Sequence, residues 1–358
     1  MASKIKIVLF EDTDQTRSGL LEGLNEHLKD GEAIPFGQSE ESAEDMQRMY
    51  QDRLESILSK APYDEATILV VDRDLSKSQN FGGLSDDTVA AAAKRLAVPI
   101  CSYARQQAPD DYNWRARWEE GRIVLSFEND EELARKAVLA ARGFAEIAAG
   151  LPGVMKDRVG KSPAKVLAAL LGKPEYSDKI ALYSVGDQNR LAEILAKAKD
   201  ETDRIKRMKC LLGYWLWDSL LRYPGLLVNE VAAASYLNIA TVDFEKSEVR
   251  TVFADALYGG PFADSKRPQW WRGMLDDIVS GENCSDGLEL ARKKVSSAIN
   301  TSQCCEDPSK PAGYYCIISG QPVSLENSKG GFSWFPRGAD LTRISKTKFD
   351  EYGPWLGS

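Results

Sequence analysis

Short apolar runs alternate with amphipathic stretches through the first 150 residues. Five of these runs are rich in β-branched or aromatic residues and carry few charges, a pattern typical of buried strands. They are "KIKIVLF" (4–10), "EAIPF" (32–36), "ATILVV" (66–71), "VPICSY" (98–103) and "RIVLSF" (122–127).

The stretches between these runs repeat apolar residues at helical spacing. We expect helices at residues 15–29, 42–60, 85–97 and 130–151, the third starting at Ser85 as N-cap with acids in its first turn. Residues 106–121 show no helical pattern. Strands that alternate with helices predict an α/β fold with a doubly wound five-stranded parallel sheet.

The pattern changes after Gly150. The Gly and Pro content of residues 151–163 indicates a linker between a domain of residues 1–150 and a domain of residues 164–358. Helical patterns continue to about residue 260, and short strand-like runs follow at 313–319 and 330–335. We therefore expect a mainly helical α+β C-terminal domain.

Composition and charge narrow the class of protein. The chain has 43% hydrophobic and 28% charged residues, as globular proteins do. No stretch approaches the ~20 apolar residues of a membrane span, and the N-terminus lacks a secretory signal pattern. We expect a cytoplasmic protein without a membrane partner. The net charge of −8 arises in the first 150 residues, which argues against nucleic-acid contact through that half and leaves the second half open.

Few residues carry the usual catalytic chemistry. The one histidine, His27, falls in a predicted helix, so mechanisms that need two histidines are excluded and a Ser-His-Asp triad is not expected. Four of the six cysteines, Cys284, Cys304, Cys305 and Cys316, lie in the last third of the chain without the paired spacing of structural zinc sites. We predict mostly buried thiols, and we favour a protein without enzymatic turnover over an enzyme.

Carboxylates gather at the ends of two predicted strands, the first and the third. Glu11 and Asp12 follow the first strand, and Asp72 ends the third, with Asp74 two residues on. In an open parallel sheet, ligands bind outside the carboxyl ends of the strands. Three carboxylates in one crevice repel each other unless they share a cation, and oxygen-only ligands suit Mg²⁺. We therefore predict a Mg²⁺ site at Glu11, Asp12 and Asp72.

The stretches "IVLFEDTD", "ILVVDRDLS" and "VPICSYA" give residues 4–148 a pattern that resembles the receiver domain of response regulators. The resemblance implies a flavodoxin-like fold in which Asp72 accepts a phosphoryl group. It also implies that Glu11, Asp12 and Asp72 hold Mg²⁺ and that Ser102 is the switch hydroxyl. A histidine kinase or another protein partner, and a homodimer, are implied in the same way.

One part of the family pattern is missing. Receivers carry a lysine at the end of strand five, where "RIVLSFENDEEL" places Ser126 or Leu125. Arg105 and Arg122 are candidate substitutes, although an Arg fork does not simply replace a point charge. We therefore describe the domain as an atypical or pseudo-receiver.

The second half gives weaker signals. Residues 229–244 loosely resemble the start of a helix-turn-helix packed through Ala233, Leu237 and Ile239, with a second helix at 243–257. This second helix carries more acids than bases, whereas a recognition helix needs exposed Arg, Lys and Asn, so we favour two packed helices over a DNA-binding motif. The tryptophan-rich stretches 213–227 and 267–279 indicate core packing first and a partner surface second.

Three functions follow. The first is a receiver-like signalling regulator that acts by protein–protein contact, gated by phosphorylation of Asp72 with Mg²⁺. The second is a DNA-binding response regulator that uses the C-terminal domain. The third is an effector enzyme of a bacterial stress or anti-phage system, for which the sequence offers no nucleophile–base pair.

Overall fold

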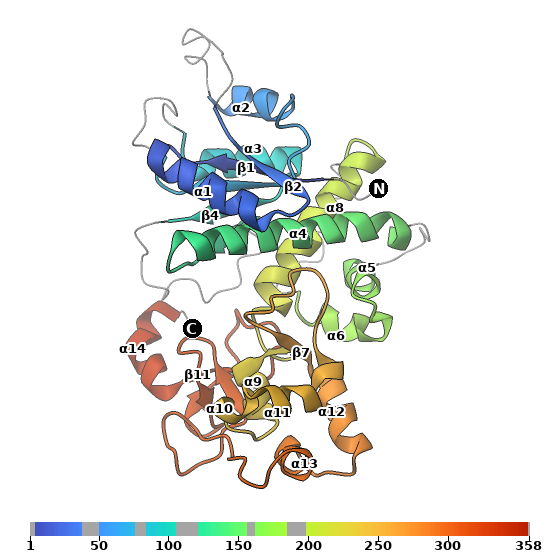
Figure 1. The fold of residues 1–358 in the computed structure, drawn as a ribbon, viewed down its shortest axis with the longest axis vertical. Helices are drawn as coiled ribbons and strands as arrows, with labels where there is room; N and C mark the ends of the chain where they lie inside the picture. The colour runs from blue at the N-terminus through green and yellow to red at the C-terminus, as the bar shows by residue number, and fades with distance from the viewer. Residues whose placement is uncertain are drawn as a thin grey trace. The chain divides into compact units, whose positions relative to one another are not determined.

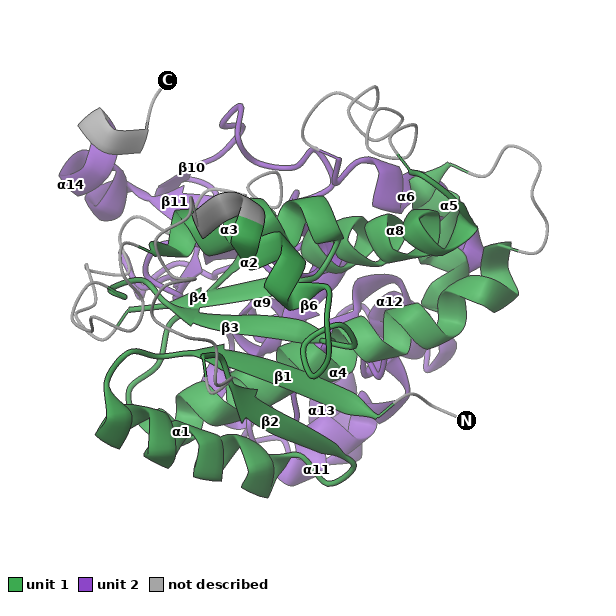
Figure 2. Cartoon of the chain, turned by 90° about the horizontal axis from the view of Figure 1, so that it is seen from above, with its two compact units in different colours: residues 1–110, 117–172, 187–215 green, residues 111–116, 173–186, 216–358 purple. Residues whose placement is uncertain are grey.

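The computed structural model describes residues 4–37, 50–75, 84–104, 121–155, 162–184 and 198–356. The chain forms two compact units (Figure 2). Unit 1 comprises residues 1–110, 117–172 and 187–215, and unit 2 comprises residues 111–116, 173–186 and 216–358. Three predictions fall partly or wholly outside the described residues. They concern Arg105, residues 106–120 of the predicted irregular stretch, and residues 42–49 of a predicted helix.

Unit 1 contains a five-stranded parallel sheet. Its strand order is β2-β1-β3-β4-β5, the order of flavodoxin-like folds. The five strands fall on the five predicted runs: β1 Ile5–Phe10, β2 Gly31–Pro35, β3 Ile68–Asp72, β4 Ile100–Tyr103 and β5 Ile123–Leu125. Every residue of β3 is buried, as expected for a parallel strand covered on both faces.

Helices cover both faces of this sheet (Figure 1). On one face, alternate strand residues such as Phe10, Leu69 and Val71 pack with α2 (Tyr50–Leu58) and α3 (Asp86–Leu96). On the other face lie α1 (Asp14–His27) and α4 (Asp130–Met155), which pack against each other. The predicted α/β class and the doubly wound sheet are confirmed.

Helix α4 is longer than predicted and has further neighbours in unit 1. It continues through Met155 into the predicted linker, and it contacts α5 (Pro163–Leu170) and α8 (Glu201–Trp215). The sequence prediction assigned α5 and α8 to the C-terminal domain, whereas their contacts place both in unit 1. Local patterns could not reveal this, because the contacts join residues far apart in sequence.

Helix α4 also corrects the expectation that no stretch of the chain is long and apolar enough to span a membrane. Among the described helices it alone is long and apolar enough to do so, with a mean hydropathy of 1.3 over its best window. Core helices of soluble proteins meet the same criterion. The contacts of α4 with α1, α8 and β1 identify it as a core helix of unit 1.

Unit 2 is mainly helical with two small sheets. Strands β6 and β7 pair antiparallel, and a second sheet has the order β10-β11-β8-β9. Its helices are η5 Pro174–Tyr176, α6 Ser177–Ala181, η6 Leu216–Leu220, α9 Glu230–Tyr236, α10 Thr241–Phe244, α11 Ser247–Val252, η7 Ala254–Ala256, α12 Arg272–Gly281, α13 Gly287–Lys294 and α14 Lys346–Leu356. Its strands are β6 Leu227–Asn229, β7 Gln269–Trp271, β8 Tyr314–Cys316, β9 Pro322–Val323, β10 Ser328–Lys329 and β11 Thr342–Ser345.

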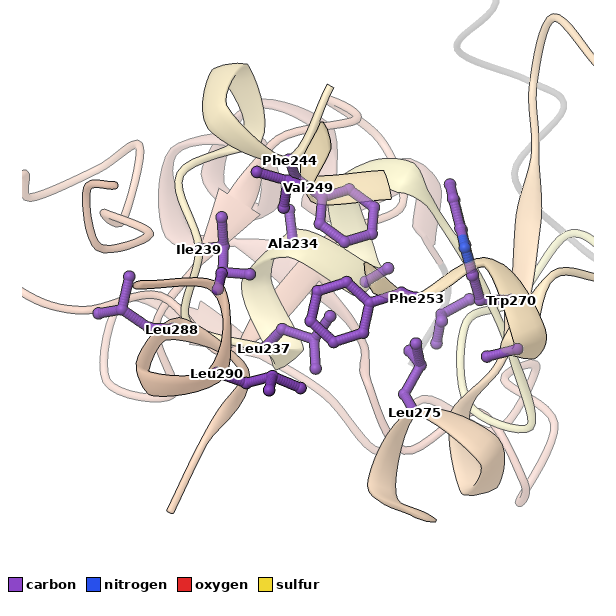
Figure 3. Close-up of a cluster of buried hydrophobic side chains, with 14 of the residues drawn as sticks. Ala234, Leu237, Ile239, Phe244, Val249, Phe253, Trp270, Leu275, Leu288 and Leu290 are labelled. Atoms are coloured by element: carbon purple, nitrogen blue, oxygen red, sulfur yellow. The ribbon is translucent and has the colours of Figure 1, made fainter. Parts of the chain in front are cut away.

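A dense apolar core holds these elements together. Figure 3 shows side chains that converge from α9, α10, α11, β7, α12 and α13 and from residues next to these elements, among them Phe253, Trp270 and Leu275. Trp215, Trp270 and Trp271 are buried, which confirms the core interpretation of the tryptophan-rich stretches for these three residues. The strand expected at 330–335 is absent from this described segment, where β10 ends at Lys329.

Candidate acidic site at the carboxyl edge of the sheet

Three carboxylates meet at the ends of two adjacent strands. Glu11 and Asp12 directly follow β1, and Asp72 is the last residue of β3. The pairing of Phe10 with Val71 brings these strand ends to the same level. One oxygen from each carboxylate lies within 4.8 Å of the other two, and all three residues are buried. The structure thus brings together the three acids predicted to share a pocket.

Hydrogen bonds fix the two strand ends. The backbone N–H of Thr13 donates to Glu11 Oε1 at 3.0 Å, and the Thr13 hydroxyl donates to Asp12 Oδ1 at 3.3 Å. The backbone N–H of Asp74 donates to Asp72 Oδ1 at 3.0 Å. These short-range bonds hold the carboxylates in place where the chain leaves the sheet.

A tyrosine from the next strand completes the anchoring of Glu11. Tyr103 pairs with Asp72 in the sheet, and its hydroxyl donates to Glu11 Oε2 at 2.9 Å. The Tyr103 ring is fully buried and packs edge-on against Phe127, just after β5. The sequence analysis did not identify Tyr103. Its place at the end of the fourth predicted strand, next to the strand that ends at Asp72, could have indicated it.

Ser102, the predicted switch residue, lies one position earlier on β4. It pairs with Val71, one residue before Asp72. Because alternate strand residues face the same side, Ser102 lies on the face of Ile100, which packs with α2 and α3. Its hydroxyl is buried and has no hydrogen-bond partner among the described residues. The structure therefore places Tyr103, and not Ser102, level with Asp72.

Basic side chains near the end of β5 are already engaged. Lys136 of α4 is buried, donates to the Ser126 carbonyl at 2.6 Å and pairs with Glu132 at 2.8 Å. Arg122, a proposed substitute for the missing lysine, instead donates to carboxylates of α3, those of Asp86 and Asp87. Lys136 is therefore the ammonium that the structure brings to the end of β5.

The pocket suits a hard divalent cation. Three carboxylates held this close repel one another, and the repulsion is strong where burial lowers the effective dielectric. All donor atoms are oxygens, the ligands that Mg²⁺ prefers while it keeps several of its waters. The donor set therefore fits the Mg²⁺ ion that the receiver pattern implies. Among the described residues, no other His, Cys, Asp or Glu group meets the same distance criterion.

Two cysteines of the last third of the chain lie in a small buried cluster. Cys304 and Cys316 are buried and pack with Val323 in a small cluster. The backbone N–H of Ser319 and that of Ser345 donate to Cys316 Sγ at 3.5 and 3.3 Å. This matches the prediction of buried thiols for these two residues, whereas Cys305 is exposed.

The helix-turn-helix interpretation meets a difficulty in unit 2. Ala233, Leu237 and Ile239 are buried, as that interpretation requires. The second helix predicted at 243–257 is instead divided among α10, α11 and η7. Asp243 is buried within α10 and accepts hydrogen bonds from Lys246 and Asn300, and α10 ends at Phe244 instead of continuing as a recognition helix.

Comparisons with known proteins assign neither a family nor a function to this chain. No family model and no curated protein matches the sequence. RcsB from Salmonella enterica serovar Typhimurium, solved bound to promoter rprA with the phosphomimetic BeF3⁻, is 12% identical over 57% of this chain and 98% of that chain, with a TM-score of 0.25. A probable glycerol dehydrogenase from Sinorhizobium meliloti 1021 is 12% identical over 86% of this chain and 79% of its own, with a TM-score of 0.17. At these TM-scores neither likeness supports a functional assignment, so the fold assignment rests on the strand order.

Proposed function

We propose that unit 1 is a receiver-like signalling module that binds Mg²⁺ through Glu11, Asp12 and Asp72 and accepts a phosphoryl group on Asp72. The observation that carries the proposal is the convergence of three buried carboxylates at the carboxyl edge of a sheet with flavodoxin-like strand order. We further propose that the module works in the cytoplasm by contact with a protein partner, a histidine kinase or a second copy.

The chemistry follows from charge. In the proposed step an Asp72 oxygen forms a bond to phosphorus while the bond from phosphorus to the donor's leaving group breaks. This step joins two anions, so positive charge must offset their repulsion. Glu11, Asp12 and Asp72 would hold a Mg²⁺ ion, which would supply that charge at the phosphoryl oxygens.

The protein's own residues prepare this step by position. Thr13 and Tyr103 hold the two oxygens of Glu11, and the N–H of Asp74 orients Asp72. Fixed carboxylates lose little conformational freedom on binding a cation, which favours affinity. We assign Tyr103 as a positioning residue that acts through Glu11. Ser102 stays the predicted switch, and its hydroxyl would have to gain a partner on phosphorylation.

The test uses the full chain with Mg²⁺ and a small phosphodonor, or with beryllofluoride. We expect Mg²⁺ binding by calorimetry and a mass increase of one phosphoryl group, both abolished by Asp72→Asn. Asp74→Asn is the matched control, because the Asp74 side chain is exposed and the substitution keeps the backbone N–H that donates to Asp72. Size-exclusion chromatography with beryllofluoride tests for the homodimer.

A second variant tests the positioning role. Tyr103→Phe removes the hydroxyl that holds Glu11, and we expect about tenfold weaker Mg²⁺ binding with Asp72 still phosphorylated. Tyr214→Phe, which alters a hydroxyl at the opposite end of β4, should leave Mg²⁺ affinity unchanged. Mg²⁺ binding that is absent, or indifferent to Asp72→Asn, would contradict the proposal.

A further inference from the structure

Unit 2 contains a small pocket, lined in part by charged side chains, that is remote in sequence from the acidic site. Its volume is about 230 Å³, and residues from α6, the start of α12 and the segment 337–340 line it. Three of the lining residues are basic, Lys179, Arg272 and Arg337, and two are acidic, Asp276 and Asp340. The balance of charge therefore favours an anion.

Tyr183 forms a rigid wall of this pocket. Its side chain is fully buried, its hydroxyl accepts from the N–H of Leu226 at 2.7 Å, and it donates to the Gly338 carbonyl at 2.9 Å. Burial raises the pKa of Tyr183, so the hydroxyl stays protonated and keeps both bonds. The wall thus keeps its shape whether or not a ligand is bound.

Two lining glycines fit tightly against aromatic rings. A Cβ on Gly338 would lie 2.3 Å from the Tyr183 ring, and one on Gly273 would lie 2.6 Å from the Tyr176 hydroxyl. Side chains at these positions would displace the rings. Glycine at both positions therefore allows the backbone to pack closely against the Tyr183 and Tyr176 side chains.

Arg272 is oriented before any ligand arrives. Its Nη1 donates to both oxygens of Asp340, at 2.7 and 2.8 Å, and its guanidinium lies 5.7 Å from the centre of the Tyr236 ring. The other guanidinium nitrogens have no hydrogen-bond partner among the described residues. A planar, fixed guanidinium with donors to spare is suited to a second oxyanion.

The two acids of the pocket are already engaged, whereas two of the cations are not. Asp340 bonds to Arg272, and Asp276 accepts the Tyr236 hydroxyl at 2.7 Å. Within the described part of the chain, Lys179 and Arg337 have no carboxylate partner, and Lys179 only lies over the Tyr176 ring at 5.3 Å. Two uncompensated positive charges therefore border the same small pocket as Arg272.

We propose that this pocket binds the phosphoryl or carboxylate group of a small metabolite, held by Lys179, Arg272 and Arg337. The volume of about 230 Å³ lies below the ~300–1,000 Å³ of pockets for drug-sized ligands, so the ligand is small. This site lies wholly within unit 2 and is independent of the acidic site in unit 1.

The experiment titrates the full chain with inorganic phosphate and, separately, with malonate, by calorimetry in a buffer of low ionic strength. We expect one of the two anions to bind with millimolar affinity or better, and the stronger binder identifies the group. Arg337→Ala and Lys179→Ala should each weaken binding about tenfold, because each removes a charge-assisted hydrogen bond. Both side chains are exposed, so the variants should fold.

The matched control is Lys266→Ala, which removes an exposed lysine of unit 2 that does not line the pocket. It should leave anion affinity unchanged. The proposal is overturned if neither anion binds at millimolar concentration, or if Lys266→Ala weakens binding as much as the two pocket variants. Circular dichroism of each variant excludes loss of the fold as the cause.

Discussion

The two hydroxyl groups at the end of β4 lie in different surroundings. The Tyr103 hydroxyl donates a hydrogen bond to Glu11 at the carboxyl edge of the sheet. The Ser102 hydroxyl is buried and has no hydrogen-bond partner among the described residues. A buried hydroxyl without a partner costs roughly 1–3 kcal/mol of stability. Such a cost is tolerated where the group has a role in another state of the protein.

Ser102→Ala tests this point. Removal of an unpaired buried hydroxyl should raise the free energy of unfolding by about 1 kcal/mol, measured by urea denaturation. If Ser102 is the switch, the same variant should also lose the response to beryllofluoride. Ser219→Ala is the control, since its buried hydroxyl donates to the Tyr183 carbonyl at 2.9 Å and its loss should destabilise by about 1 kcal/mol. Equal destabilisation by both changes would show that Ser102 has a partner.

At the scale of elements, helix α8 is joined to unit 1 by close packing. A Cβ on Gly213 would lie 2.1 Å from the Phe144 ring of α4, so only glycine allows this approach. One residue on, the Tyr214 hydroxyl accepts from the N–H of Ile100 at the start of β4, at 2.8 Å. The helix thus covers α4 and satisfies a backbone donor of the sheet.

Gly213→Ala should therefore lower the free energy of unfolding by about 1–3 kcal/mol, because Phe144 must leave its rotamer or α8 must move away. Gly19→Ala in α1 is the matched control. Its added Cβ meets nothing within 4 Å, and alanine should stabilise that helix by about 0.5–1 kcal/mol. Urea denaturation of both variants checks the opposite signs, and a stable Gly213→Ala protein would contradict the packing argument.

A second link between elements is electrostatic. Asp243 of α10 accepts from the backbone N–H of Asn300 at 2.8 Å, from its side chain at 3.0 Å and from Lys246 at 2.5 Å. Burial alone would raise the pKa of Asp243, but these hydrogen bonds outweigh it and the net pKa lies below the usual 3.8. The ionised form is therefore favoured by folding.

The sign of the pH effect follows from this lowered pKa. The stabilisation by Asp243 is complete above the unfolded-state pKa, near 4, and is lost as pH falls through the lower folded-state value. Asp243→Asn should cost about 1–3 kcal/mol at pH 7, and the difference from the unmodified protein should shrink below about pH 4. Denaturation followed by tryptophan fluorescence measures both. Asp255→Asn, at an exposed acid of η7, should have almost no effect at either pH.

At the scale of the whole molecule, unit 1 is assembled from separate stretches of the chain. Residues 187–215 return to it after residues 173–186 have entered unit 2. The sheet and its nearest helices are complete by Met155, but two later helices of the described chain, α5 and α8, also pack against α4. A domain boundary at residues 151–163 would therefore separate α4 from two helices that pack against it, α5 and α8.

Two fragments test where the stable unit ends. Residues 1–155 should fold with Phe144 and its neighbours exposed, bind a hydrophobic dye and unfold at lower urea than residues 1–215, which retain α8. Each buried aromatic ring exposed costs about 1.5–3 kcal/mol. Equal urea midpoints and equal dye binding would support the boundary predicted from the sequence.

The strands of the unit 1 sheet, and the acids at the ends of these strands, could be predicted from the amino-acid sequence alone. A continuous apolar run is a local property of the sequence, so the five strands fall where the runs predict. Parallel strands then put Glu11, Asp12 and Asp72 at one edge, because strand ends define where the chain turns. The helices α1, α3 and α4 follow from the same local periodicity.

The contacts around these elements could not be predicted in this way, because they depend on how distant segments pack. The bond from Ile100 to Tyr214 spans 114 residues and that from Tyr103 to Glu11 spans 92, so no local pattern encodes either. Register decided that Tyr103, and not Ser102, lies level with Asp72. The pairing of β6 with β7 and the anion pocket of unit 2 arise the same way. Each depends on side chains that meet only after distant segments pack, and packing energy has no signature in a short window of sequence.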